Sequence, residues 1–312
     1  MSAPRARAFA QVDVFTQVAL RGNPVAVVLD AEGLDDMAMQ AFARWTQLSE
    51  TTFVLPASDA ARAQGADYQL RIFTPGGELA FAGHPTLGSC HAWRAHGGQP
   101  QSTQRIVQEC KKGLVAIDTR GASLAFAAPS LTRSAPAPEL LAAVRQALDL
   151  APDQLLAAEQ LDNGAQWLGL LLDSPDTVLA LAPDHARLKA LGQKVGVAAL
   201  YPAPDSPLLV RRSSREARAF ASAPAQPPRP AVQLEVRAFA AATGIHEDPV
   251  TGSLNASLAQ WLTAEGRLQA PYMANQGSCL GRDGWVQVHA DDQGQLWVGG
   301  HTVGCIQGTV LL

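Results

Sequence analysis

Cysteine is scarce in this 312-residue chain, and its spacing carries no metal-binding or redox signature. The four cysteines, Cys90, Cys110, Cys279 and Cys305, lie far apart and form no Cys-x-x-Cys pair. This pattern is typical of buried or semi-buried thiols in a reducing compartment, not of disulfides or metal ligands. The sequence therefore predicts no metal site.

The chain also lacks a strong charge bias and a long apolar run near its first residue. Its formal net charge is −4 with 47% hydrophobic residues, which argues against a nucleic-acid partner and predicts up to two well-formed domain cores. Residues 1–7 lead directly into a strand-like run, without the apolar segment of a signal peptide or membrane span. We therefore expect a cytoplasmic protein with neither a nucleic-acid nor a membrane partner.

Two segments, one in each half of the chain, repeat one pattern. Arg71-Ile72-Phe73 is followed by Gly83-His84-Pro85, and Arg237-Ala238-Phe239 is followed by Glu247-Asp248-Pro249. In both copies an ionisable residue precedes a proline, and a helical stretch rich in small residues follows. This predicts a duplicated strand-loop-helix unit whose copies face each other, so that one cleft holds both ionisable residues. Such a cleft suits proton transfer on both faces of a small molecule.

Strand and helix signals alternate along the chain, with strands predominating. The first half has strand patterns at residues 8–15, 24–29, 51–55, 68–74, 104–109, 114–119 and 123–127, and a helix pattern at 35–44. The second half has a helix pattern after Pro249 and strand patterns at 167–172, 195–201, 207–211, 232–239, 285–290, 296–298 and 303–312.

Two segments rich in proline interrupt these patterns. Residues 129–138 break both periodicities and predict the linker between domains. We expect an N-terminal domain of residues 1–128, joined by the returning strand 301–312, and a C-terminal domain of 129–300. Residues 212–230 begin with a basic cluster and predict a mobile surface loop, whose cations are either solvated or cover an anionic ligand.

The paired motifs have a structural and a functional interpretation. Asp248 and Pro249 fit the N-cap and first position of a helix, and His84 precedes a proline in a poorer version of the same start. Alternatively, small residues leave backbone N–H groups open at two helix N-termini, where a carboxylate would bind. Those small residues are Gly83, Gly88, Gly252 and Ser253. A His and an Asp at matching places are harder to explain by capping, and this favours a functional site.

Glu50 is a third candidate. It lies at a helix-to-strand junction in Leu48-Ser49-Glu50-Thr51-Thr52-Phe53, among apolar neighbours. Taken by itself, this position is interpreted as a surface residue. If it is partly buried, its pKa rises, and the carboxyl can act as acid and base in turn near neutral pH.

These residues belong to a set of motifs that together resemble the PhzF-like isomerases, which are related in fold to diaminopimelate epimerase. The matching pieces, spread from about residue 12 to residue 256, are Val12-Asp13-Val14-Phe15, Gly22-Asn23-Pro24-Val25-Ala26-Val27, Leu48-Ser49-Glu50-Thr51-Thr52-Phe53, Arg71-Ile72-Phe73-Thr74-Pro75, Glu78-Leu79-Ala80-Phe81-Ala82-Gly83-His84-Pro85 and Glu247-Asp248-Pro249-Val250-Thr251-Gly252-Ser253. The resemblance implies an α+β fold of two similar domains, each a β-barrel-like mixed sheet around a central helix, and a homodimer.

The resemblance also implies roles for individual residues. Glu50 would be the general acid and base, assisted by His84 and Asp248, in moving a proton on a small carboxylate-bearing substrate. Substrate binding would fall to Gly83, Thr251, Gly252 and Ser253. No cofactor or metal is expected, because acid/base groups and charge stabilisation suffice for an activated C–H. A non-catalytic binding protein of the same fold is the alternative.

Other features set limits on this interpretation. Two-cysteine epimerases of the wider fold carry catalytic thiols where this chain has Ala82 and Thr251, so cysteine-based racemisation is disfavoured. His301 follows two glycines and either shapes a turn or marks a subgroup with another ligand. Arg71 and Arg237 are expected to form structural ion pairs at strand ends.

Overall fold

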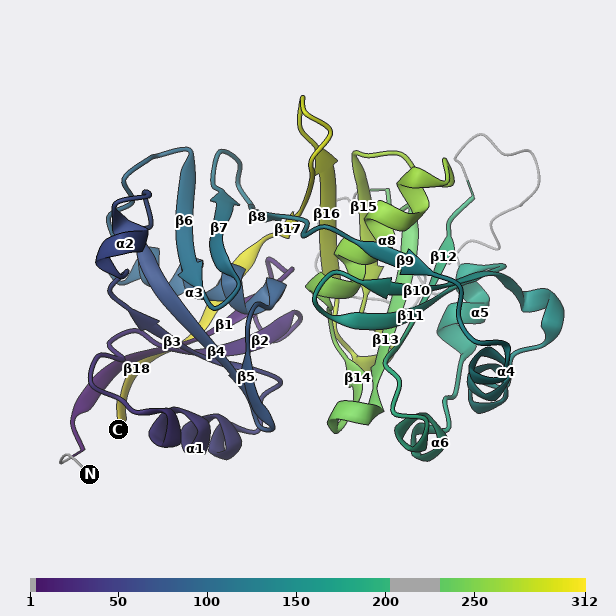
Figure 1. Cartoon of the computed structure of the whole chain (residues 1–312), viewed down its shortest axis with the longest axis horizontal. Coiled ribbons are helices and arrows are strands. Elements are labelled where there is room, and N and C mark those ends of the chain that lie inside the picture. Colours follow the sequence, from purple (N-terminus) through teal and green to yellow (C-terminus); the bar gives the residue numbers. More distant parts are fainter. Residues whose placement is uncertain (1–3, 203–230) are drawn as a thin grey trace, which may run out of the picture.

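The structure of the chain, a computed structural model, describes residues 4–202 and 231–312. Two halves lie side by side, and each consists of strands around a central helix (Figure 1). The central helices are α3 (Gly83–Ala95) and α8 (Gly252–Ala264), and most of their residues are buried. The predicted α+β class, with a mixed sheet around a helix in each half, is confirmed.

The elements of the first half are β1 (Ala6–Val14), β2 (Asn23–Val28), α1 (Asp36–Thr46), β3 (Thr51–Leu55), α2 (Asp59–Arg62), β4 (Tyr68–Thr74), β5 (Gly77–Leu79), α3, β6 (Arg105–Cys110), β7 (Gly113–Asp118) and β8 (Leu124–Ala127). Those that follow are β9 (Thr132–Ser134), α4 (Pro138–Ala147), β10 (Leu155–Asp162), β11 (Gln166–Leu172), α5 (Pro175–Ala180), α6 (His185–Ala190), β12 (Val195–Leu200), β13 (Leu234–Ala240), β14 (Ile245–Asp248), α8, β15 (Tyr272–Gln276), β16 (Gly284–Ala290), β17 (Leu296–Gly300) and β18 (Thr302–Leu311). Short 3₁₀ turns lie at Pro152–Gln154, Ala241–Thr243 and Ser278–Leu280.

Strand pairing repeats between the halves. In the first half β2 and β3 are parallel, as are β4 and β6; in the second half β11 and β12 are parallel, as are β13 and β15. β9, which follows residue 128, pairs with β10 of the second half, and β18, which follows residue 300, returns to pair with β1 of the first half. The proposed boundaries after residues 128 and 300 stay a prediction, and these two pairings agree with it.

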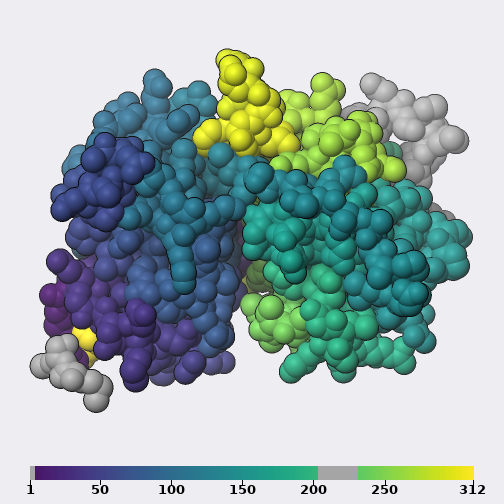
Figure 2. All heavy atoms as spheres, in the orientation of Figure 1, coloured from purple at the N-terminus to yellow at the C-terminus, as the bar shows by residue number. Residues whose placement is uncertain are grey.

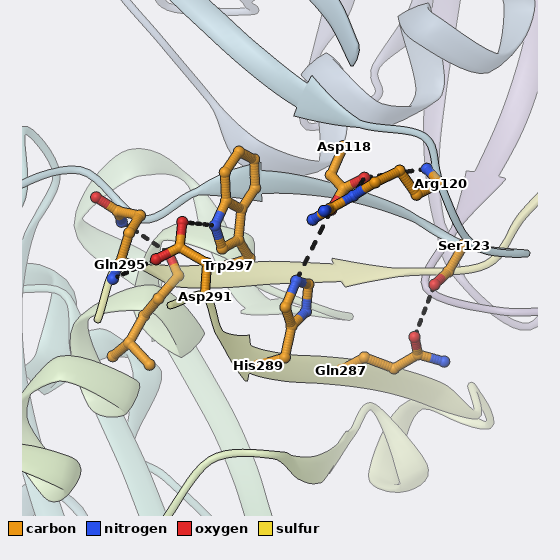
Figure 3. A network of polar contacts seen from close by, with 9 residues as sticks. Asp118, Arg120, Ser123, Gln287, His289, Asp291, Gln295 and Trp297 are labelled. Atoms are coloured by element: carbon orange, nitrogen blue, oxygen red, sulfur yellow. Dashed lines mark hydrogen bonds and ion pairs between the residues drawn. The ribbon is translucent and has the colours of Figure 1, made fainter. Parts of the chain in front are cut away.

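A polar network accompanies the antiparallel pair β8–β17, where the halves are joined. Figure 3 shows Ser123 beside Gln287, with a hydrogen bond of 2.7 Å from Ser123 Oγ to Gln287 Oε1. Nearby, His289 Nε2 lies 4.0 Å from Asp118 Oδ2, and the Arg120 guanidinium binds the same carboxylate (Figure 3). These contacts tie β7 and its following turn to β16 across the junction.

Matching ion pairs confirm the duplication. Arg71 binds Glu78 through Nε and Nη2 at 2.8 and 3.0 Å, and Arg237 binds Glu247 through the same atoms at 2.9 and 2.8 Å. The predicted structural ion pairs are therefore confirmed, but their predicted place was wrong, because Arg71 and Arg237 lie in the middle of β4 and β13 and not at strand ends. Each guanidinium also lies over the phenylalanine two residues later, 5.1 Å from the ring centroid in the first half and 5.0 Å in the second.

The repeat aligns the site residues differently from the sequence prediction. Glu78 and Glu247 each precede the first residue of the central helix, Gly83 or Gly252, by the same five positions. His84 therefore corresponds to Ser253, not to Asp248. The prediction of a His and an Asp at matching places was wrong. The sequences His84-Pro85 and Asp248-Pro249 look alike, but they lie at different positions of the repeated unit.

The helix-start interpretation of Asp248 was also wrong. Asp248 is the last residue of β14, and α8 begins at Gly252 with Thr251 at its N-cap. The Asp248 carboxylate accepts hydrogen bonds from side chains, as described below, and so does not cap the helix.

Other local predictions were closer. The strands at 51–55 and 68–74 have the predicted bounds, and α1 begins after Asp35, whose Oδ1 accepts the Ala38 N–H at 2.8 Å. The predicted linker 129–138 contains β9 and the first residue of α4. The predicted strand 207–211 and the basic segment 212–230 lie outside the described residues. All four cysteines, which are among the described residues, are free; Cys279 is exposed, contrary to the expected burial.

Candidate active site

The N-termini of α3 and α8 abut at the centre of the molecule. A Cβ atom on Gly83 would lie 3.3 Å from the Gly252 Cα, and one on Gly252 would lie 3.2 Å from the Gly83 Cα. Only glycine permits this approach, because any side chain at either position would push the helices apart. The first N–H groups of a helix have no partner within the helix, so two sets of donors and two positive dipole ends meet here. On the surface, Figure 2 shows a groove between the blue half and the green half.

Glu50 is buried at this meeting point. α1 ends at Thr46, and its C-cap Gln47 adopts a left-handed conformation. The chain then turns so that Glu50 directly precedes β3. Its side chain is 14% exposed, and its Oε2 lies 3.2 Å from Nε2 of His84. Burial, and next the charge of Asp248, raise the pKa of Glu50 to about 8. The surface interpretation of Glu50 is therefore wrong, and its carboxyl has the environment that acid/base chemistry requires.

His84, the second residue of α3, is buried and uncharged at neutral pH. Burial lowers the pKa of His84 to about 3, while the Pro24 carbonyl has a smaller opposite effect. In the tautomer that carries its proton on Nδ1, directed to that carbonyl, Nε2 is an acceptor facing Glu50. Neither Nε2 nor Glu50 Oε2 has a hydrogen-bond partner among the described residues. In that tautomer a protonated Glu50 can donate to His84 Nε2 after a small rotation.

Asp248 lies beside this pair and is held by two side-chain donors. Its Oδ1 accepts from Asn23 Nδ2 at 2.9 Å, and its Oδ2 accepts from Thr251 Oγ1 at 2.6 Å. Burial raises the pKa of Asp248 to about 6, although both hydrogen bonds act in the opposite direction. Because Glu50 and Asp248 influence each other's ionisation, the two carboxyls are expected to titrate as a pair.

Asn23 connects the residues of the site and had no role assigned from the sequence. Its Nδ2 also lies 2.8 Å from the Val250 carbonyl oxygen and 3.3 Å from His84 Nδ1. Asn23 begins β2 in the first half, while Asp248 and Val250 belong to the second half, so one amide spans both. The signal was present in Gly22-Asn23-Pro24, but the motif alone does not reveal the partner.

Thr251 and Gln276 form the support behind Asp248. Gln276 Nε2 donates to the Asp248 carbonyl oxygen at 3.0 Å and to Thr251 Oγ1 at 2.9 Å, while its Oε1 accepts the Thr251 N–H at 3.0 Å. The Thr251 hydroxyl proton is directed to Asp248, so this side chain orients the carboxylate. A direct contact between Thr251 and substrate remains a prediction. Gln276, which is fully buried, was missed because nothing in its local sequence marks it.

At the start of α8, the Ser253 hydroxyl donates to no acceptor within the described part of the chain. Its Oγ accepts the Trp167 indole N–H at 3.1 Å, and its carbonyl oxygen accepts from Asn163 Nδ2 at 2.9 Å. The hydroxyl O–H is left to donate to a ligand. Together with the backbone N–H groups near Gly83 and Gly252, it offers a binding place for a carboxylate.

The remaining sequence candidates lie outside this cluster of side chains. Burial raises the pKa of the Cys90 thiol to about 12, which leaves it unsuited to act as a thiolate. His301 lies between β17 and β18, where its carbonyl oxygen accepts the Thr16 N–H at 3.1 Å. Both interpretations of its side chain, a turn-shaping residue and a subgroup ligand contact, stay predictions. Among residues 4–202 and 231–312, no group of three or more potential metal ligands is gathered. Over the same residues, no helix is long and apolar enough to span a membrane.

A family model described as phenazine biosynthesis-like protein matches residues 12–308. The chain belongs to this family. The trans-2,3-dihydro-3-hydroxyanthranilate isomerase of Pseudomonas fluorescens is 31% identical over 310 residues, covering 96% of this chain and 98% of that protein. The Escherichia coli K12 protein named uncharacterized isomerase YddE is 29% identical over 299 residues, with 89% and 88% covered. The chain is thus an isomerase whose reaction these names leave open.

Solved structures agree on the fold. A Bacillus anthracis phenazine biosynthesis protein of the PhzF family superimposes with a TM-score of 0.77 at 22% identity, covering 99% of this chain and all of that one. An Agrobacterium vitis hydroxyproline epimerase superimposes with a TM-score of 0.59 at 14% identity, with 99% and 93% covered. The shared architecture thus extends to epimerases.

Proposed function

We propose that the protein is a cofactor-independent isomerase that moves a proton within a small carboxylate-bearing substrate, with Glu50 as general acid and base. The observation that carries this proposal is the buried Glu50 carboxyl, whose pKa is raised to about 8 and whose Oε2 lies 3.2 Å from His84 Nε2. Such a carboxyl is present in both protonation states near neutral pH. It can take a proton from one carbon of an unsaturated substrate and return one to another.

His84 and Asp248 support this cycle in different ways. Neutral His84 accepts a hydrogen bond from protonated Glu50 and so fixes the orientation of the carboxyl. Asp248 destabilises the Glu50 anion by its own charge, which keeps the proton available for delivery. We assign the substrate carboxylate to the Ser253 hydroxyl and the N–H groups at the two helix N-termini.

The substrate of the Pseudomonas relative, trans-2,3-dihydro-3-hydroxyanthranilate, is the first compound to test. It should be incubated in deuterated water, with a panel of amino and unsaturated acids, and followed by NMR. We expect deuterium to enter one substrate with the wild type and not with Glu50→Gln. Glu139→Gln, which removes an exposed carboxylate on α4, is the matched control and should behave like the wild type.

Two outcomes would contradict the proposal. Equal exchange by the wild type and Glu50→Gln would remove Glu50 from the chemistry. Saturable binding of one acid, with no exchange of any, would instead support the non-catalytic binding protein.

A further inference from the structure

Lys194 occupies in the second half the place that Glu50 occupies in the first. The first residue of β3 pairs with Phe73, and the first residue of β12 pairs with Phe239. These phenylalanines correspond, because each lies two residues after an arginine of the matching ion pairs. Glu50 and Lys194 directly precede β3 and β12, respectively, and are therefore counterparts. The duplication thus places a carboxyl and an ammonium at equivalent strand starts.

The Lys194 side chain lies near the start of α8. Its Nζ is 4.7 Å from the centroid of the Trp167 ring, a cation–π contact. The same indole donates its N–H to Ser253 Oγ at 3.1 Å. One indole ring therefore connects the ammonium to the hydroxyl that the proposed function assigns to the substrate carboxylate.

Lys194 has no ion-pair partner among the residues that the structure describes, although several carboxyls lie around it. Its charge acts on Glu50 and Asp248, lowering the pKa of each against the effect of burial, and Asp162 also faces it. Within residues 4–202 and 231–312, however, none of these carboxylates forms an ion pair with it. Burial lowers the pKa of Lys194 itself, so the ammonium is partly desolvated. A partly desolvated ammonium without an ion pair is electrostatically unfavourable, and a bound anion would stabilise it.

We propose that Lys194 binds the anionic group of the substrate together with the Ser253 hydroxyl, and so determines that the substrate is an acid. The proposal rests on the proposed function for the location of the substrate, but it concerns recognition and not proton transfer. Glu50 and Asp248 give the site an excess of acidic groups, and His84 is neutral. Lys194 supplies the positive charge that attracts an anionic substrate into this otherwise acidic site.

Isothermal titration calorimetry can test this with one pair of ligands, 3-hydroxyanthranilate and its carboxamide. The two differ in charge and little in shape. We expect the wild type to bind the acid at least about 10-fold more tightly than the amide. Lys194→Met should weaken binding of the acid by about 10- to 100-fold and leave binding of the amide unchanged, as the loss of a charge-assisted contact predicts. Lys194→Arg should retain part of the preference.

Lys189→Met is the matched control, because it removes the same charge from an exposed position on α6. It should bind both compounds like the wild type. Thermal unfolding of each variant shows whether it is folded, and Lys194→Gln replaces Lys194→Met if the latter is not.

Three results would overturn the inference. They are equal wild-type affinity for acid and amide, equal weakening of both by Lys194→Met, and failure of the acid to bind. Equal weakening would indicate that Lys194 only adjusts the ionisation of Glu50 and Asp248. Because binding is measured without turnover, a Glu50→Gln variant that still exchanges deuterium would contradict the proposed function and leave this inference standing.

Discussion

Asn23 and Asp248 join the two halves of the site, with Asn23 Nδ2 donating to Asp248 Oδ1 at 2.9 Å. Asn23 is fully buried, and its amide also contacts a backbone carbonyl of the second half. Orientation of the Asp248 carboxylate therefore depends on a residue that is distant in sequence. The first prediction concerns this contact.

Asn23→Ala should slow deuterium exchange by about 10- to 100-fold, because Asp248 loses a charge-assisted hydrogen bond worth about 1.5–3 kcal/mol. The free energy of unfolding, measured in urea, should fall by about 1–3 kcal/mol for the same reason. Gln99→Ala removes an exposed amide and should leave both quantities unchanged. Wild-type exchange by Asn23→Ala would show that this bridge is not needed.

Stability should fall as pH rises from about 6.5 to about 8. In this range folded Glu50, whose pKa is raised to about 8, still holds a proton that the unfolded chain has lost, so the native state binds more protons. The loss that Glu50 contributes is at most about 1.4 kcal/mol per pH unit. His84 contributes in the opposite direction, because its pKa is lowered to about 3, but only below its unfolded pKa of about 6.5.

Glu50→Gln should remove most of this decline, and urea unfolding at pH 6.5 and at pH 8 measures it. The interval lies above the pKa of about 6 of Asp248 in the folded protein. Burial raises the pKa of Glu235 to about 7, so Glu235 adds a smaller decline in the same direction, chiefly below pH 7. Glu50, which has the higher pKa, accounts for the larger part of the difference. The same slope in the wild type and in Glu50→Gln would contradict the burial of this carboxyl.

Gly83→Ala should destabilise the protein by about 1–3 kcal/mol and slow deuterium exchange. The added Cβ would lie 2.6 Å from Cζ of Phe126, and the rigid ring cannot move aside without displacing its neighbours. The shift would separate the helix N-termini that form the site. Gly308→Ala is the control, since a Cβ there meets nothing within 4 Å. Equal stability of the two variants in thermal unfolding would refute the close-approach argument.

The two matching arginines should differ in their importance for stability. Arg237→Ala leaves Glu247 buried without its cation, and we expect a loss of about 3–5 kcal/mol. The Arg237 and Glu247 side chains are 6% and 7% exposed, against 23% and 20% for Arg71 and Glu78. Arg71→Ala should therefore cost less, because water can solvate the remaining carboxylate. Urea unfolding of both variants checks this order, and the reverse order would count against it.

Local sequence patterns predicted some strands and helices correctly and failed to predict others. The β-branched run of β3 sits between a helix end and a proline, and its bounds followed from the sequence alone. By contrast, β10 and β15 were not predicted. The β10 sequence has two Ala, one Glu and one Asp among its eight residues, and these types have low strand propensity. It becomes a strand through pairing with β9 and β11.

For the candidate site, too, the sequence predicted some residues and missed others. The motifs around Glu50, His84 and Asp248 identified residues that the structure brings together, although their catalytic roles remain proposals. Asn23, Gln276 and Lys194 were missed. Each acquires its place through a partner from a distant segment, and a single sequence without strand register does not reveal such partners.

The sequence by itself determined the duplicated unit, the buried strands and the absence of thiols at Ala82 and Thr251, because these depend on residue type and short-range spacing. Only the tertiary structure decided that His84 corresponds to Ser253 and that Asp248 ends a strand. It also decided that the counterpart of Glu50 in the second half is a lysine, Lys194. Strand register and the abutting glycines of two helices set these relationships. The raised pKa of Glu50 likewise arises from burial and from a charge in the other half, which the chain acquires only when it folds.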